Sequence, residues 1–63
     1  MKLSEIASKF WQSLPESAKT AETQAAIRDA YELAMEDMED GKVSLARQRF
    51  ADDLKEIQRK AQS

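Results

Sequence analysis

The residues after Gly41 carry the strongest structural signal in this chain, an apolar repeat with the period of an α-helix. Apolar side chains return there every three or four residues, and polar or charged side chains fill most of the positions between them. This spacing aligns them along one face of a helix. It predicts a helix over about 45–61, with an apolar stripe that consists of Val43, Ala46, Phe50, Leu54, Ile57 and Ala61.

A second apolar stripe lies before Gly41 and predicts a longer helix over about 15–40. Its positions follow the same helical spacing and include Ile27, Tyr31, Ala34 and Met38. The first half of this segment is rich in alanine, so two interpretations stay open there. Either the early turns fray, or the helix restarts near Thr20.

The junction between the two stripes has the residues of a tight helical turn. Gly41 stands where a left-handed conformation closes a helix, and only glycine enters that conformation freely. Ser44 is expected to cap the start of the following helix. Because only about three residues connect the two helices, they must run antiparallel and pack together. The preceding helix is predicted to be longer by several residues, so its first turns extend beyond the hairpin.

A short N-terminal helix is predicted over about 3–13. Its apolar face consists of Leu3, Ile6, Phe10 and Leu14. Pro15 then ends this helix or begins the next one. Ser13 and Glu16 have the spacing of a capping box, in which each side chain accepts a hydrogen bond from the backbone amide of the other. We therefore expect the second helix to begin there.

Together these segments predict an all-α protein with a single domain over 1–63. The expected architecture is a small three-helix bundle, in which the N-terminal helix packs across the antiparallel hairpin of 15–40 and 45–61. Ten of the apolar residues are alanines, so the core is thin, and such chains often bury further surface against a second copy or a partner. The centre is expected to contain Phe10, Leu14, Ile27, Tyr31, Phe50, Leu54 and Ile57.

Histidine and cysteine, on which many catalytic and metal sites depend, are absent from this chain. Their absence removes the commonest general base and metal ligand, and it excludes disulfides and thiolate metal sites. Carboxylates that are adjacent in sequence, such as Asp52 and Asp53, diverge by about 100° around a helix and do not converge on one substrate. We therefore expect that the protein is not an enzyme, and that it has no cofactor, no metal site and no small-molecule substrate.

Charge is divided unequally between the predicted helices. Residues 16–40 carry a net charge of −6, whereas residues 41–63 carry +3. Four of the carboxylates gather at the end of the acidic helix, where the helix macrodipole disfavours them. Two explanations remain open: either Lys42, Arg47 and Arg49 neutralise this cluster from across the turn, or a basic partner does.

Basic residues on the last predicted helix raise the alternative of nucleic-acid binding. Arg47, Lys55 and Arg59 lie near one face of that helix, but Asp52 and Asp53 interrupt the face. The chain as a whole is acidic, and phosphate contacts dominate duplex binding, so nucleic acid is the less favoured partner. The related alternative is an acidic charge mimic, of the kind that a phage-encoded inhibitor of a host protein uses.

Protein–protein contacts are the favoured function. Phe10 and Trp11 are adjacent and cannot both point into one small core, so Trp11 either forms a partner contact or folds over Ala18, Ala21 or Ala25. A second apolar patch is expected near the turn. Met35 and Leu45 lie outside the two stripes, and they would form this patch together with Met38 and Val43. The candidate partner contacts are Trp11, Met35, Glu36, Asp37, Met38, Glu39, Asp40 and Leu45.

The stretch from Met38 to Leu45 resembles the turn of the small subunit of exonuclease VII, an acidic helical hairpin with a Gly-x-Leu-x-Leu turn. The chain departs from that family at Arg49, where the family places a leucine, and the helix with Phe10 and Trp11 has no counterpart there. An accessory subunit of a nuclease is therefore the lesser alternative, and the family assignment is not adopted.

The expected function is a small adaptor, inhibitor or regulatory subunit. It would bind a larger protein, or its own copy, through apolar helix faces. The beginning of the chain lacks an apolar run of the length of a signal peptide, and no segment has the length of a membrane span. We expect a cytoplasmic protein of bacterial or phage origin.

Overall fold

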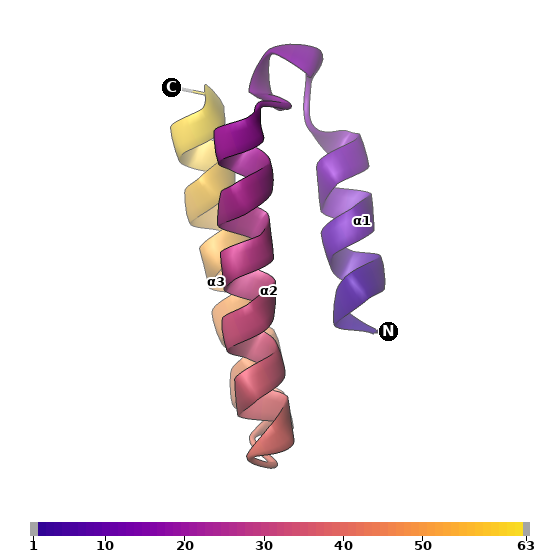
Figure 1. The fold of residues 1–63 in the computed structure, drawn as a ribbon, viewed down its shortest axis with the longest axis vertical. Coiled ribbons are helices and arrows are strands. Elements are labelled where there is room, and N and C mark those ends of the chain that lie inside the picture. Colours follow the sequence, from indigo (N-terminus) through magenta and orange to yellow (C-terminus); the bar gives the residue numbers. More distant parts are fainter. Residues whose placement is uncertain (1, 63) are drawn as a thin grey trace.

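Three α-helices form an elongated bundle in the computed structural model, which describes residues 2–62. The helices are α1 (Leu3–Ser13), α2 (Ala21–Glu39) and α3 (Val43–Gln62), and a 3₁₀ turn, η1 (Glu16–Ala18), connects the first two. Helix α2 packs against both of the others and runs antiparallel to each (Figure 1). Helix α1 does not extend as far as the turn between α2 and α3, so the last turns of α2 lie beyond the start of α1. The predicted all-α three-helix bundle is confirmed.

Helix α1 ends at Ser13, two residues before Pro15, for a steric reason. A proline ring disfavours the helical conformation of the preceding residue, and Leu14 is extended, with φ −74° and ψ 144°. The capping box predicted for Ser13 and Glu16 is wrong. The Ser13 hydroxyl instead donates to the carbonyl of Phe10 at 2.8 Å, and Glu16 lies 3.8 Å from the ammonium group of Lys19.

The connection reaches α2 through two tight turns in succession. After η1, the amide of Thr20 donates to the carbonyl of Ala18 across Lys19, whose φ of −84° and ψ of 71° are those of an inverse γ-turn. Thr20 then caps α2, because its hydroxyl oxygen accepts from the amide of Thr23 at 3.2 Å. The restart near Thr20 is thus confirmed, and a helix from residue 15 is wrong.

The late start of α2 also changes the proportions of the hairpin. Helix α2 has 19 residues and α3 has 20, so the expected overhang of a longer second helix is wrong. These two nearly equal helices share the most extensive helix–helix packing among the described residues. Helix α1 reaches the hairpin by the turns of residues 14–20 rather than by folding back from an extended helix end.

We expect Thr20→Ala to lower the free energy of unfolding by about 1 kcal/mol, because it removes the cap of α2 and the hydroxyl partner of the buried Thr23. Ser13→Ala is the matched control, and we expect it to stay within about 0.5 kcal/mol of the wild type. Urea titration followed by circular dichroism measures both. Equal losses in the two variants would show that the start of α2 does not depend on Thr20.

The turn between α2 and α3 is a Schellman motif. Gly41 has φ +81°, its amide donates to the carbonyl of Met38, and the amide of Lys42 donates to the carbonyl of Asp37. The left-handed glycine predicted at this position is confirmed. The predicted cap at Ser44 is wrong, because α3 already begins at Val43 and places Ser44 in its first turn.

A side chain at position 41 has open space around it, so substitution there tests the backbone alone. We expect Gly41→Ala to cost about 1–2 kcal/mol, because alanine disfavours a positive φ. Gly41→Asn should cost less, since asparagine tolerates the left-handed region. The urea midpoints of the two variants measure the difference, and an alanine variant as stable as the wild type would contradict the strained-turn explanation.

The core lies where all three helices meet, and alanines occupy much of it. Phe50 is the largest fully buried side chain, and the ring of the half-buried Tyr31 packs edge-on against it with 6.2 Å between centroids. Of the predicted centre, Phe10, Tyr31 and Ile57 are only partly buried. The buried apolar residues are Leu3, Leu14, Ala18, Ile27, Ala30, Ala34, Ala46, Phe50 and Leu54.

Candidate protein-binding groove

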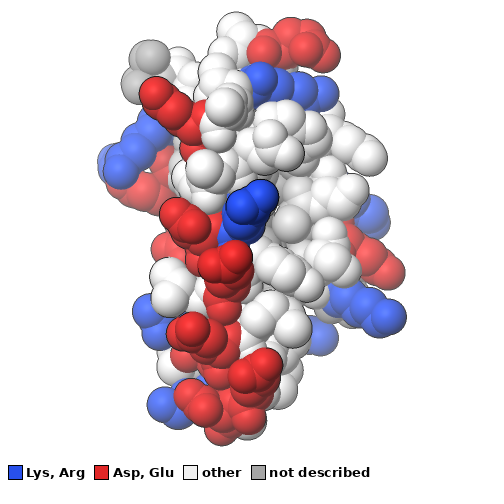
Figure 2. Space-filling view, viewed as in Figure 1, with Lys and Arg blue, Asp and Glu red and all other residues white. Residues whose placement is uncertain are grey.

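An open groove of about 390 Å³ runs between α1 and α2. It lies on the face of these two helices that Figure 2 presents, where an uncharged strip separates the acidic surface of α2 from the edge of α1. Its floor and walls combine apolar rings and methyl groups with a few polar side chains. The lining residues are Ser4, Ala7, Ser8, Trp11, Gln24, Ile27, Arg28 and Tyr31.

The wall from α1 is built from one face of that helix. Three small residues precede an indole at helical spacing, so they leave room that larger side chains would have filled. Trp11 closes this wall and is half-buried. The α2 residues that line the groove with it are Gln24, Ile27, Arg28 and Tyr31, and none of Ala18, Ala21 and Ala25 takes part. Trp11 therefore lines the groove, and it also packs against the buried core cluster that includes Ala18.

The wall from α2 is anchored in the core. Ile27 is 8% exposed, and Tyr31 is held by the edge-on packing of its ring on the buried Phe50. These contacts hold the side chains of the α2 wall in place without a ligand. A preformed apolar surface binds at a lower entropic cost than one that must be ordered on binding.

Five exposed carboxylates form an acidic ridge along the solvent-facing side of α2. The ridge extends from the middle of the helix to the turn, and Figure 2 shows it as a continuous red surface beside the uncharged strip. None of the five forms an ion pair within residues 2–62. The residues of the acidic ridge are Asp29, Glu32, Glu36, Glu39 and Asp40.

Asp37, the remaining member of the predicted acidic cluster, belongs to a different surface. Its carboxylate pairs with the guanidinium group of Arg49 at 3.3 Å, and its side chain is 16% exposed. The neutralisation from across the turn that the sequence suggested is thus confirmed for this pair. The pair offsets the unfavourable position of Asp37 at the end of α2 by roughly 0.2–1 kcal/mol.

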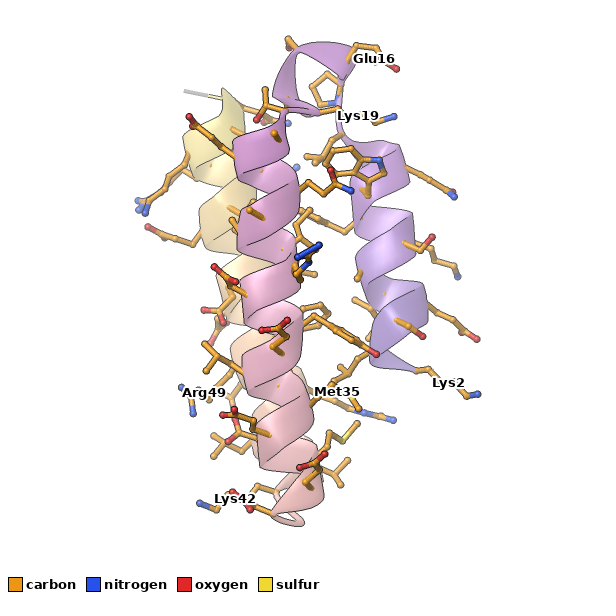
Figure 3. All side chains as sticks on the ribbon, viewed as in Figure 1. Lys2, Glu16, Lys19, Met35, Lys42 and Arg49 are labelled. Carbon is orange, nitrogen blue, oxygen red and sulfur yellow. The ribbon has the colours of Figure 1, made fainter. Side chains whose placement is uncertain are left out.

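The predicted apolar patch at the turn is divided between two sides of the hairpin. Met35 and Arg49 project on opposite sides, with Met35 on the side of α1 (Figure 3). Leu45 precedes Arg49 by one helical turn and shares its side, so the structure does not bring Leu45 and Met35 together. Leu33, which is not among the predicted partner contacts, is 51% exposed and stands one turn before Asp37.

A second hollow matches the groove in volume, but charged side chains make up more of its lining. It measures about 400 Å³ and lies between the start of α2 and the end of α3, and Glu22, Glu56 and Lys60 are among its lining residues. The described part of the chain contains no cluster of acidic residues with the arrangement of a metal site. Nor does it contain a helix that is both long and apolar enough to cross a lipid bilayer.

Comparison of this chain with protein-family models, with curated proteins and with solved structures found no match. The resemblance to the small subunit of exonuclease VII therefore remains confined to the turn. A Schellman motif at Gly41 accounts for it, because a left-handed glycine followed by an apolar residue is a common way to end a helix before the next one begins.

Proposed function

We propose that this protein is a non-catalytic protein-binding module that docks a partner in the α1–α2 groove. The observation that carries the proposal is the half-buried Trp11 in an open, largely apolar groove whose α2 wall is fixed by the core. Tryptophan is enriched among the residues that dominate binding energies, and a preformed pocket beside it favours a specific contact. An adaptor, inhibitor or regulatory subunit would use such a surface.

The alternatives have less support. On α3, Arg49 pairs with Asp37 and Arg59 pairs with Glu56 at 2.6 Å, so two of its cations already face carboxylates of the same chain. The acidic ridge also repels phosphate groups. Charge mimicry of nucleic acid is compatible with the ridge, but it leaves the apolar groove unexplained. A nuclease accessory subunit has no support beyond the turn.

The proposal is tested by photo-crosslinking from the groove. A benzoylphenylalanine at Ser8, which is exposed and lines the groove, is compared with the same residue at the exposed Gln48 on α3. In extract of the source organism, we expect a discrete adduct from position 8 that excess wild-type protein competes away, and none from position 48. Equal labelling from both positions, or labelling that wild-type protein does not reduce, would contradict groove-specific binding.

A further inference from the structure

We infer that the occupant of the α1–α2 groove is an amphipathic helix of another protein whose polar face is basic. This inference rests on the proposed function and specifies its partner. Both walls of the groove are helical, and their lining residues follow the 3–4 spacing over two turns, from Ser4 to Trp11 and from Gln24 to Tyr31. An antiparallel helix pair with such an apolar seam receives a further helix by ridges-into-grooves packing.

The charge of the surroundings sets the character of that helix. The α1 wall carries no charged side chain, whereas the α2 wall borders the acidic ridge. Glu32 follows the groove residue Arg28 by one helical turn, about 6 Å along the axis, which is less than the Debye length of about 8–10 Å at physiological salt. A partner with apolar side chains in the groove and Lys or Arg toward α2 would neutralise carboxylates that have no ion-pair partner within the described residues.

Arg28 does not fit this pattern of charge, and its substitution therefore tests the charge of the partner directly. It is the only cation among the residues that line the groove, and it lies between the groove and the ridge. Against a basic helix its charge is repulsive. Arg28→Glu should therefore strengthen binding, whereas a partner that Arg28 recognises through an acidic group would bind this variant more weakly.

A second copy of the chain fits the groove less well than a foreign helix. The exposed large apolar residues are Leu33 and Met35 on α2 and Val43 and Leu45 on α3. Each pair is two residues apart, so its members point to opposite sides of their helix. Between positions 2 and 62, therefore, no helix presents a pair of exposed large apolar side chains on one face beside basic ones.

The test uses three synthetic 18-residue amphipathic peptides that lack tryptophan, share one leucine face and differ only in a lysine, glutamine or glutamate polar face. Trp11 is the only tryptophan in the chain, so its fluorescence reports binding. We expect the lysine peptide to bind roughly tenfold more tightly than the glutamine peptide at low salt, with the advantage lost as salt screens the ridge. Equal affinity of the lysine and glutamine peptides would overturn the inference.

Matched charge reversals locate the attraction. Glu32→Lys and Asp52→Lys change the net charge equally at exposed positions on α2 and α3. We expect Glu32→Lys to weaken the lysine peptide roughly three- to tenfold, Arg28→Glu to strengthen it by a similar factor, and Asp52→Lys to leave it unchanged. Equal losses for Glu32→Lys and Asp52→Lys would overturn the inference, because the attraction would then be non-local.

Two outcomes separate the failure of this inference from that of the proposed function. If the glutamine or glutamate peptide binds best and crosslinking from position 8 still captures a protein, the groove binds a partner of another charge, and only the basic helix is overturned. If sedimentation shows a dimer that Ser8→Trp dissociates and Gln48→Trp does not, the occupant is a second copy, which also overturns it. The proposed function is contradicted if position 8 gives no specific crosslink.

Discussion

Phe50→Ala is expected to remove a large part of the free energy of unfolding at 25 °C. Phe50 is 1% exposed and contacts the core from the middle of α3, and its ring supports Tyr31 in the groove wall. Removal of a buried phenylalanine side chain costs about 3–5 kcal/mol. A domain of 63 residues is stabilised by roughly 3–9 kcal/mol in total, so this loss consumes a large part of the stability.

Circular dichroism in urea, at several protein concentrations, measures the effect of Phe50→Ala. Phe50→Leu serves as the conservative control and should cost less, because it keeps most of the buried apolar volume. Leu45→Ala is the exposed control: Leu45 is 41% exposed, and we expect a loss of less than about 1 kcal/mol. A Phe50→Ala variant with the urea midpoint of Leu45→Ala would contradict the arrangement of the core.

Leu3→Ala is expected to have the second-largest effect and to act on α1. Leu3 is 2% exposed, although it lies in the first turn of α1, so it anchors the end of α1 that is farthest from the connection to α2. The expected loss is about 2–5 kcal/mol. Because α2 packs more extensively against α3 than against α1, we expect α1 to detach before the hairpin unfolds.

Amide hydrogen exchange distinguishes this result from general unfolding. In Leu3→Ala, protection should fall throughout α1 and remain in the facing turns of α2 and α3, and the fluorescence of Trp11 should shift toward that of an exposed indole. Ser4→Ala changes the neighbouring, exposed residue and should leave both signals unchanged. Uniform loss of protection in all three helices would show that α1 does not unfold separately.

The sequence predicts a helix best where a single pattern determines its ends. Helix α3 was predicted over 45–61 and is observed over Val43–Gln62, because one clean stripe determines it. The left-handed Gly41 followed from its place after an acidic helix end. At residues 13–20 two signals competed: a capping-box spacing at Ser13 and Glu16, and a proline that forces Leu14 out of the helix. The effect of the proline determines the structure: Leu14 is extended, and Thr20 caps α2 instead.

The groove itself was not predicted, although Trp11 was singled out. It depends on the side of α2 along which α1 packs, and on the small residues Ser4, Ala7 and Ser8, which have no signal of their own. Helical spacing alone places one of the predicted contacts. Leu45 precedes Arg49 by four residues and therefore shares its side of α3, away from Met35. Whether the other predicted partner contacts bind a partner stays a prediction.

Binding in the α1–α2 groove is tested most directly by two-dimensional ¹H–¹⁵N NMR spectra of the protein titrated with the lysine-faced peptide. We predict that the indole N–H of Trp11 and the amides of the groove walls shift together, from Ser4 to Trp11 and from Gln24 to Tyr31. The outer face of α3, around Gln48 and Lys55, should keep its chemical shifts. Shifts that concentrate on α3 while the signal of Trp11 stays in place would contradict the groove as the docking site.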